Sequence, residues 1–399
     1  MTLRNPLRRL VAAATTAGVA LSLVLVSSLT STAATAAPTS GLDVGVNFHG
    51  MWSDWASDAD RGQALDQYVA AGMTTVRMDV AWSMIQPKPG AYDNWGVNFV
   101  DRVLGLITDR GLEPLVTFWR APEWARPAGS SKYTPPSNPA QYAAAAEWAA
   151  RRWASKVTSW QVWNEPNHPS YFVGTDPVVY TRILQAAYPA IKRGNPNAQV
   201  VFGGVSYNDT PWLAKSYAAG ARGHFDIMAT HPYQGVADAA PETPANGSIY
   251  RMTHVSAVHD LMAAHGDGGK KIWFTEFGWS THANWSPIDN WDRGVTEATQ
   301  AEYFVRTLKM LRASHPYVTN VFWYRDRNGD DDEPQHDNYG LLYRDLRPKP
   351  VMAALRTYLS TLGTIAPPTT DPTPLPAGKK KWRRISEVQL VPAWKLVKR

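Results

Sequence analysis

The sequence contains no cysteine. This absence excludes a disulfide framework, a thiolate metal site and catalysis by a cysteine nucleophile. The sequence also lacks a His-Glu-x-x-His motif or a comparable cluster of ligands, so we expect no catalytic metal. No glycine-rich phosphate loop follows the first apolar run. Residues 266–271 resemble such a loop weakly, but they precede a strand and predict a surface turn. We therefore expect no cofactor.

The net positive charge comes from the two ends of the chain. The formal net charge is +6, to which residues 1–36 contribute +3 and residues 378–399 contribute +7, so residues 37–377 carry −4. A mildly acidic body offers no basic face to phosphate groups. We therefore expect no nucleic-acid partner for this part of the protein.

The first 36 residues have the pattern of an export signal. Arg4, Arg8 and Arg9 precede an uncharged apolar stretch over 10–29, and a small-residue cleavage pattern ends at Ala36. This order predicts a signal peptide over 1–36 and a secreted, extracellular protein. A transmembrane anchor is the alternative, because the apolar stretch is near the ~20 residues that span a bilayer.

Short apolar runs alternate with helical patterns from 42 to 362. The runs cover 42–48, 74–80, 114–119, 158–163, 199–203, 227–231, 271–276 and 318–323. Most of them are apolar on consecutive positions, which is typical of buried parallel strands. Eight strand–helix units predict an α/β fold, a closed (β/α)8 TIM barrel forming a single catalytic domain over 37–365. An open doubly wound sheet is the rival fold.

Helical periodicity is clearest in the last two units. Phe304 and Leu308 share one face of the first helix, for which Thr296 is the expected N-cap. Pro350 is expected in the first turn of the second helix, where its missing N–H does no harm.

The chain after the barrel divides into a Pro/Thr-rich linker over 366–377 and a basic tail over 378–399. The linker is a stiff spacer with nothing to bury, and the tail is too short to form a core, so we expect it to be disordered. Its cations and two tryptophans fit a tether to an anionic cell wall or a membrane surface. A remnant without a role is the other interpretation.

Two glutamates stand where two expected strands end. Glu165 follows the run 158–163, and Glu276 ends the run 271–276. Catalytic side chains of closed barrels project from the C-terminal strand ends, so both point into one mouth from opposite sides. Retaining glycosidases need such a pair of carboxylates about 5–5.5 Å apart.

The motifs around these glutamates resemble those of the clan A retaining glycoside hydrolases. Trp163-Asn164-Glu165-Pro166 is followed 111 residues later by Glu276 within Thr275-Glu276-Phe277-Gly278-Trp279. The resemblance spans 42–362. Within the clan the chain is most similar to family 39 and next to family 5, because 118–122 lacks the histidine that family 5 members usually carry after strand three. The resemblance implies that Glu165 is the acid/base and Glu276 the nucleophile.

The resemblance also implies roles for residues around the pair. Asn164 would hydrogen-bond the sugar 2-hydroxyl, Arg77 would keep the nucleophile ionised, and Tyr233, in His231-Pro232-Tyr233, would place its hydroxyl on the nucleophile. Structural roles remain the alternative for Arg77, as an ion pair, and for His231, as a core histidine.

Aromatic residues are abundant, with 18 tryptophans and 17 tyrosines, and their excess fits a cleft in which flat faces stack. By resemblance Trp323 would be the floor under the sugar, and Trp82 belongs to a loop like that after strand two in family 39. Trp119 and Trp279 follow strand ends and are candidate sugar platforms. Packing in the core is the alternative for about half of the rim tryptophans.

The acidic run 326–333 has oxygen-bearing side chains at alternating positions, as a calcium loop does. Asp331 stands where such a loop requires a glycine, so we expect a solvated loop at the rim of the cleft and no metal.

The leading hypothesis is a secreted, monomeric β-glycoside hydrolase that cleaves an extracellular polysaccharide or oligosaccharide by double displacement. The rim aromatics, and the lack of an appended β-sandwich, favour endo action. A non-catalytic carbohydrate-binding barrel and a transglycosylase that uses the same residues are the alternatives.

Overall fold

The computed structural model of the chain describes residues 41–52, 55, 57–284, 289–330 and 332–363. The expected signal peptide (1–36), linker (366–377) and basic tail (378–399) lie outside the described residues. Within the described part, no helix has both the length and the apolar character needed to cross a membrane.

The strands form one parallel sheet. They are β1 (Asp43–Asn47), β2 (Thr75–Ala81), β3 (Glu113–Trp119), β4 (Ser159–Val162), β5 (Gln199–Val201), β6 (Val205–Ser206), β7 (Met228–His231), β8 (Ile272–Phe277) and β9 (Val318–Trp323). Their order in the sheet is β5-β4-β3-β2-β1-β9-β8-β7-β6, so β1 is hydrogen-bonded to β2 on one side and to β9 on the other. Each predicted apolar run overlaps a strand, with bounds that differ by at most two residues.

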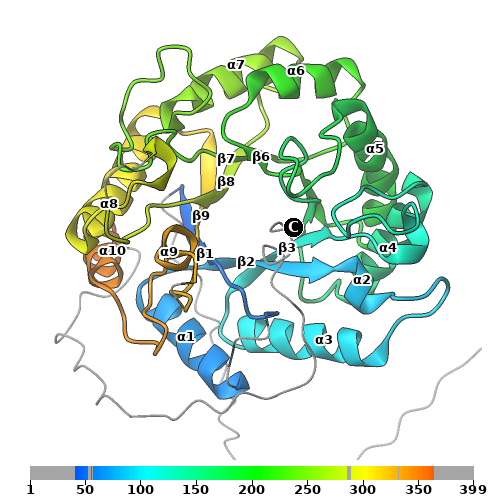
Figure 1. Cartoon of the computed structure of the whole chain (residues 1–399), viewed down its shortest axis with the longest axis horizontal. Coiled ribbons are helices and arrows are strands. Elements are labelled where there is room, and N and C mark those ends of the chain that lie inside the picture. Colours follow the sequence, from blue (N-terminus) through cyan, green and yellow to red (C-terminus); the bar gives the residue numbers. More distant parts are fainter. Residues whose placement is uncertain (1–40, 53–54, 56, 285–288, 331, 364–399) are drawn as a thin grey trace, which may run out of the picture. The chain divides into compact units, whose positions relative to one another are not determined.

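The predicted fifth strand, 199–203, corresponds to β5, and a further short strand, β6, follows after residues 202–204. Val201, at the end of β5, bridges to Ile227 just before β7, and Val205 of β6 pairs with Thr230 of β7. Both strands therefore lie along β7, and the sheet closes on itself as the ring seen in Figure 1. The prediction of a (β/α)8 barrel is confirmed.

Helices surround this ring (Figure 1). They are α1 (Asp58–Ala70), α2 (Trp82–Ile85), α3 (Asn94–Thr108), α4 (Pro139–Arg152), α5 (Pro177–Gly194), α6 (Thr210–Ala218), α7 (Val255–Ala264), α8 (Glu297–Ser314), α9 (Pro334–Asp337) and α10 (Pro350–Thr361). The side chain of Thr296 accepts a hydrogen bond from the N–H of Thr299, which confirms the N-cap of α8. Pro350 opens α10 as predicted.

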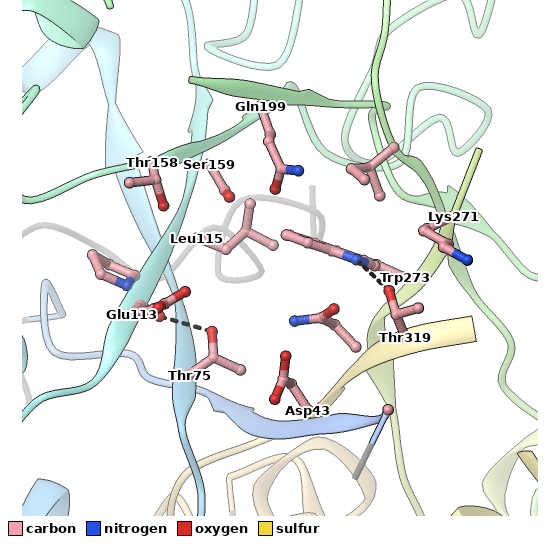
Figure 2. Close-up of a pocket in the computed structure, with 14 residues that line it drawn as sticks. Asp43, Thr75, Glu113, Leu115, Thr158, Ser159, Gln199, Lys271, Trp273 and Thr319 are labelled. Carbon is pink, nitrogen blue, oxygen red and sulfur yellow. Dashed lines mark hydrogen bonds between the residues drawn. The ribbon is translucent and has the colours of Figure 1, made fainter. Parts of the chain in front are cut away.

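The interior of the barrel is packed and is not a pore. A cluster of apolar side chains from several strands fills it: Leu115, Val201, Ile227, Ala229, Trp273 and Phe322. A polar cavity of about 370 Å³ lies at the N-terminal strand ends, where Asp43, Glu113 and Lys271 line it (Figure 2). Barrels of this kind carry their chemistry at the opposite, C-terminal ends of the strands.

Candidate active site

Glu165 and Glu276 meet at the C-terminal ends of the strands. Glu165 lies three residues beyond the end of β4, and Glu276 is the next-to-last residue of β8. One oxygen of each carboxylate and one ring nitrogen of His231 lie within 4.8 Å of one another. This short separation resembles the about 5–5.5 Å of retaining glycosidases and not the about 6.5–9.5 Å of inverting ones.

The backbone after β4 turns so that two successive side chains reach the site. Trp163 and Glu165 have φ angles of 71° and 43°, the left-handed region that non-glycine residues rarely adopt. As a result, Trp163 packs outward against Phe172, while Asn164 and Glu165 both contact groups of the site. Such strain is common where a fold holds functional side chains in place.

An irregularity in β8 has the same effect on the other glutamate. The pairing of β8 with β9 shifts register between Phe274 and Phe277. The two residues between them both point to the site, because Thr275 contacts His231 and Glu276 contacts Arg77. Alternation in a regular strand would have sent one of the two to the opposite face.

Arg77 connects the strands that carry the site. Its guanidinium donates to Oε1 of Glu276 at 2.8 Å, to Oδ1 of Asn164 at 2.6 Å and to Oε1 of Gln161 at 2.9 Å. It also donates to Asn47 of β1. Because Arg77 is only 4% exposed, it places a fixed, poorly screened positive charge beside the Glu276 carboxylate.

Tyr233 holds the other oxygen of this carboxylate. Its hydroxyl donates to Oε2 of Glu276 at 3.1 Å. Both carboxylate oxygens of Glu276 are therefore oriented by protein donors, one from Arg77 and one from Tyr233. The family resemblance implied that Arg77 and Tyr233 lie at Glu276, and both contacts are present.

Glu165 and His231 form a buried pair with shifted pKa values. Burial raises the pKa of Glu165 to about 7, against the opposing effects of His168, Arg77 and Ser206. Burial lowers the pKa of His231 to about 3, so the imidazole is neutral. Its Nδ1 lies 2.7 Å from Oε1 of Glu165, and its Nε2 lies 3.0 Å from the hydroxyl of Thr275. Two carboxylates in such different surroundings are suited to different roles.

Within the part of the chain that the structure describes, the same three side chains are the only group close enough to share a metal ion. Each of the three already has protein partners, however. Arg77 supplies a positive charge to Glu276, and Thr275 occupies the second nitrogen of His231. These three side chains therefore fit two carboxyl groups held by hydrogen bonds, with His231 beside them, better than they fit a metal site.

The predictions for Trp82, Trp279 and Trp323 as sugar-binding residues are wrong. Each is at most 1% exposed. Their indole N–H groups donate within the protein, to Gln86, Ala239 and Tyr339 respectively. The physical reason is clear at Trp323, whose ring packs 4.6 Å from that of Phe304 on α8, outside the barrel wall. Core packing explains these tryptophans.

Trp119, at the end of β3, is different. Its ring is 4% exposed, yet its indole N–H has no hydrogen-bond partner among the described residues. The ring lies 5.5 Å from that of Tyr133 and 6.2 Å from that of Tyr171. Trp119 lies at a strand end, as expected, but a side chain that is only 4% exposed presents little of its face for a sugar to stack on.

Sequence reasoning missed several residues of the site. Tyr324 follows the buried Trp323, and the negative charge of Glu276 helps to keep its pKa above the usual value, after burial. Asn47 and Gln161 both bind Arg77. The available signal was polarity, because each of these two is a polar residue flanked by apolar ones near the C-terminal end of its run.

Three further aromatic side chains were not predicted from the sequence. Tyr207 follows β6, and Tyr250 and Trp291 come from later loops, with ring centroids 4.9–5.3 Å apart. Tyr250 and Trp291 are each 42% exposed. The backbone N–H of Tyr207 donates to the carbonyl of His231, whose ring contacts Glu165, so the trio lies near this glutamate.

The acidic loop is only partly as expected. Asp326 is buried, not solvated, and accepts from the backbone N–H of His49 and contacts its Nδ1 at 3.0 Å. Asp330 pairs with Arg344 at 3.4 Å. Asp331 lies outside the described residues. Asp326 and Asp330 are therefore satisfied by protein groups.

Comparison with known proteins relates this chain to carbohydrate-cleaving enzymes. A family model described as Cellulase (glycosyl hydrolase family 5) matches residues 35–325. A family 39 glycoside hydrolase from Bacteroides cellulosilyticus is 26% identical with a TM-score of 0.64, over 80% of this chain and 64% of that one. The GH5_18 protein from Streptomyces cattleya, solved with GlcNAc, is 21% identical with a TM-score of 0.62, over 82% of this chain and 81% of that one, which shows the shared fold.

A curated relative matches over a shorter stretch. A chloroplastic benzoxazinyl glucoside β-D-glucosidase from Zea mays is 26% identical over 182 residues, which are 41% of this chain and 32% of that protein. The chain thus spans about a third of this relative and less than two thirds of the Bacteroides enzyme.

Proposed function

Because the chain belongs to the cellulase family, glycosyl hydrolase family 5, we propose that it is a secreted β-glycoside hydrolase that works with retention. The observation that carries this proposal is the Glu165–Glu276 pair, whose oxygens lie within 4.8 Å and whose surroundings differ. Glu276 is oriented by Arg77 and Tyr233, and Glu165 has a pKa raised to about 7.

In the first step Glu276 attacks the anomeric carbon while Glu165 gives its proton to the departing glycosidic oxygen. The carbon–oxygen bond breaks, and a glycosyl-enzyme ester forms on Glu276. In the second step the Glu165 carboxylate takes a proton from water, which attacks the same carbon and releases Glu276. The proton that Glu165 lost is thereby restored, and the sugar keeps its original anomeric configuration.

Neighbouring groups prepare both steps. Asn164 accepts from Arg77 through Oδ1, which leaves its amide N–H groups to donate to the 2-hydroxyl of the sugar. Such a contact accelerates the reaction where it strengthens in the transition state. The Arg77 charge favours the carboxylate form of Glu276, the form that attacks.

Aromatic residues on two sides of Glu165 support endo action on a polysaccharide. The trio Tyr207, Tyr250 and Trp291 lies on the side of β6, and the partly exposed Tyr171 lies on the side of β3, against Trp119. Sugar rings stack well on flat apolar faces, so a chain running past the acid would find contacts in both directions.

The proposed export and surface attachment rest on the sequence of the two ends of the chain. The arginines and the apolar stretch of 1–36 support export, and the cations of 378–399 support attachment to an anionic wall or membrane surface. Attachment through charge weakens as salt rises, whereas attachment through Trp382 and Trp394 does not. We expect the enzyme to act as a monomer.

The test separates the two glutamates by azide rescue. Glu276→Gly removes the nucleophile, so azide attacks from below the ring and gives the α-glycosyl azide of a β-linked substrate. Glu165→Ala keeps the nucleophile, and azide replaces the attacking water and gives the β-glycosyl azide. Both products are identified by NMR, with an aryl glycoside of good leaving group as substrate.

Reversed anomers would show that the two roles are exchanged. Near-normal activity in both variants would refute the two-glutamate mechanism, whereas a wild-type protein that binds sugars but cleaves none of them would be a carbohydrate-binding barrel. Product chromatography on a panel of polysaccharides identifies the sugar and the cutting mode, and oligosaccharides longer than the donor would reveal a transglycosylase.

A further inference from the structure

Three cations gather in the loop that follows β3. Arg120 comes directly after Trp119, and Arg126 and Lys132 follow in the segment that leads to α4. The Arg120 guanidinium lies 4.3 Å from the ring of Trp119 and 5.7 Å from that of Tyr133, and the Lys132 ammonium lies 5.5 Å from the ring of Tyr133. We call Trp119, Arg120, Lys132 and Tyr133 the cationic cluster.

The three cations of this loop form no ion pair in the part of the chain that the structure describes. Within the described ranges, no carboxylate forms an ion pair with Arg120, Lys132 or Arg126. Arg126 donates to the carbonyl oxygens of Ser130 and Ala121, so it shapes the loop. Burial, and then the positive charges of Arg120 and Arg126, lower the pKa of Lys132 to about 8. Like charges held together in a half-buried loop repel, and a bound anion would relieve this repulsion.

Three buried hydrogen-bond donors of the cluster are also unused. The indole N–H of Trp119, the Nε–H of Arg120 and the hydroxyl of Tyr133 have no partner among the residues that the structure describes. Trp119 is 4% exposed and Tyr133 8%. A buried donor without an acceptor destabilises the fold, so three at one place point to an acceptor that the described part of the protein does not itself provide.

The cluster borders the proposed catalytic pair. β3 lies between β2 and β4 in the sheet, and the N–H of Trp163, two residues before Glu165, donates to the carbonyl of Phe118. Tyr171 connects the two places, since its ring lies 6.1 Å from that of Tyr133 and Glu165 contributes to its raised pKa. When a polysaccharide places one sugar residue beside Glu165, an adjacent sugar residue of the same chain therefore lies within reach of the cluster.

Two acidic residues accompany the cluster, Glu123 within the loop and Asp79 on β2. Asp79 contributes to the raised pKa of Tyr133, after burial and against Arg120. Asp79 lies on β2 two residues beyond Arg77, so both side chains face the barrel axis. Two carboxylates, Glu123 and Asp79, against three cations leave this loop side of the mouth with a net positive charge.

We infer that the cationic cluster is a subsite for a sugar residue that carries an anionic oxygen group, a hexuronate carboxylate or a sulfate ester. Arg120 and Lys132 bind the anion, and Trp119 and Tyr133 donate to its oxygens or to an adjacent hydroxyl. This inference rests on the proposed function, and it names the substrate class as an acidic polysaccharide. Charge-assisted hydrogen bonds to such groups are the strong ones.

The test measures binding, so it does not depend on turnover. Glu276→Gln, which keeps the shape of the site, is titrated with uronate-bearing fragments of glucuronoxylan, alginate and pectate. Each fragment is compared with its carboxyl-reduced, neutral form, and sulfated fragments are compared with desulfated ones. Tryptophan fluorescence reports binding, because Trp119 lies in the cluster.

Arg120→Gln and Lys132→Gln are added singly to this background. Lys309→Gln is the matched control, since Lys309 also lies over a tyrosine ring, that of Tyr358 at 5.8 Å, but on the outer helix α8. We expect at least one acidic fragment to bind about ten- to a hundredfold more tightly than its neutral form. This ratio should fall towards one in both cluster variants and stay unchanged in Lys309→Gln.

A preference confined to sulfated fragments supports the subsite and identifies the anion as a sulfate ester. The inference is overturned if no acidic fragment is preferred, or if the preference survives in both cluster variants. The azide experiment is unaffected by these outcomes. Correct anomers without any acidic preference would leave a retaining hydrolase of neutral sugars, whereas acidic preference without azide products would leave a binding protein.

Discussion

The Nδ1 atom of His231 lies 2.7 Å from Oε1 of Glu165, and the two groups are buried with pKa values shifted in opposite directions. The imidazole stays neutral, so it has one N–H to give. It donates to Glu165 when the carboxyl is ionised and accepts from it when the carboxyl is protonated, because Thr275 can complement either tautomer. Glu165 is thus bonded in both of the states that an acid/base must pass through.

The pH profile of kcat/KM should have its basic limb near pH 7. Glu165 must be protonated to assist the leaving group, and its pKa is raised to about 7, so the active form is lost as the pH rises through that value. The measurement compares a polysaccharide with a dinitrophenyl glycoside, whose leaving group needs no acid. The limb should be present for the first substrate and absent for the second. A basic limb near the ordinary pKa of a glutamate would contradict the assignment of Glu165 as the acid.

Tyr233→Phe should lower kcat about ten- to a hundredfold with little change in KM, since it removes one hydrogen bond to the charged Glu276. Thermal unfolding should change little. Tyr142→Phe is the matched control, because the Tyr142 hydroxyl donates to the carbonyl of Phe118 in the core. That variant should lose stability and keep its kcat. Equal kinetic effects in the two variants would argue against a role for Tyr233 at the nucleophile.

Gly204→Ala should impair catalysis far more than Gly223→Ala. Both glycines have positive φ angles, +61° and +81°, so both substitutions are strained. A methyl group at 204 would also lie 2.4 Å from Nε2 of His231, whereas one at 223 meets nothing within 4 Å. Displacing His231 misplaces Glu165, and such shifts cost about a hundredfold in rate. Steady-state kinetics and melting temperatures distinguish the two effects, and similar kcat values would refute the argument.

Trp323→Phe should destabilise the fold by roughly 1–3 kcal/mol and leave KM unchanged, because Trp323 is packed outside the barrel wall. Tyr324→Leu should have the opposite pattern, with little change in stability. Its KM for an oligosaccharide should rise about three- to tenfold through loss of an aromatic contact. Denaturant titration and steady-state kinetics of both variants check this. A large KM effect at Trp323 would restore it as the floor of the sugar site.

The barrel and the two glutamates were predictable because they depend on simple regularities. Apolar runs with helical spacers specify a parallel barrel, and position at a strand end selects Glu165 and Glu276 without knowledge of other side chains. Arg77 and Tyr233 were also identified, through the resemblance, and both contact Glu276.

The orientation of individual side chains was not predictable. Trp323 and Tyr324 are neighbours at the end of β9, and nothing in the residue types tells which one faces the axis. The left-handed backbone at Trp163 and the register shift around Glu276 break the alternation on which such an argument relies. The cationic cluster likewise depends on a loop conformation that brings Arg120 and Lys132 to the same rings.

The pairing of β1 with β9 determines when the protein can finish folding. The amide of Asn47 donates to the carbonyl of Phe322, which lies 275 residues later in the chain. At ribosomal speeds of about 5–20 residues per second, β1 waits roughly 15–55 s for this partner to be synthesised. During that interval the ring is open, and its unpaired strand edges are exposed to chaperones and to aggregation. A precursor bound for a translocation channel that admits only unfolded chains would benefit from this delay.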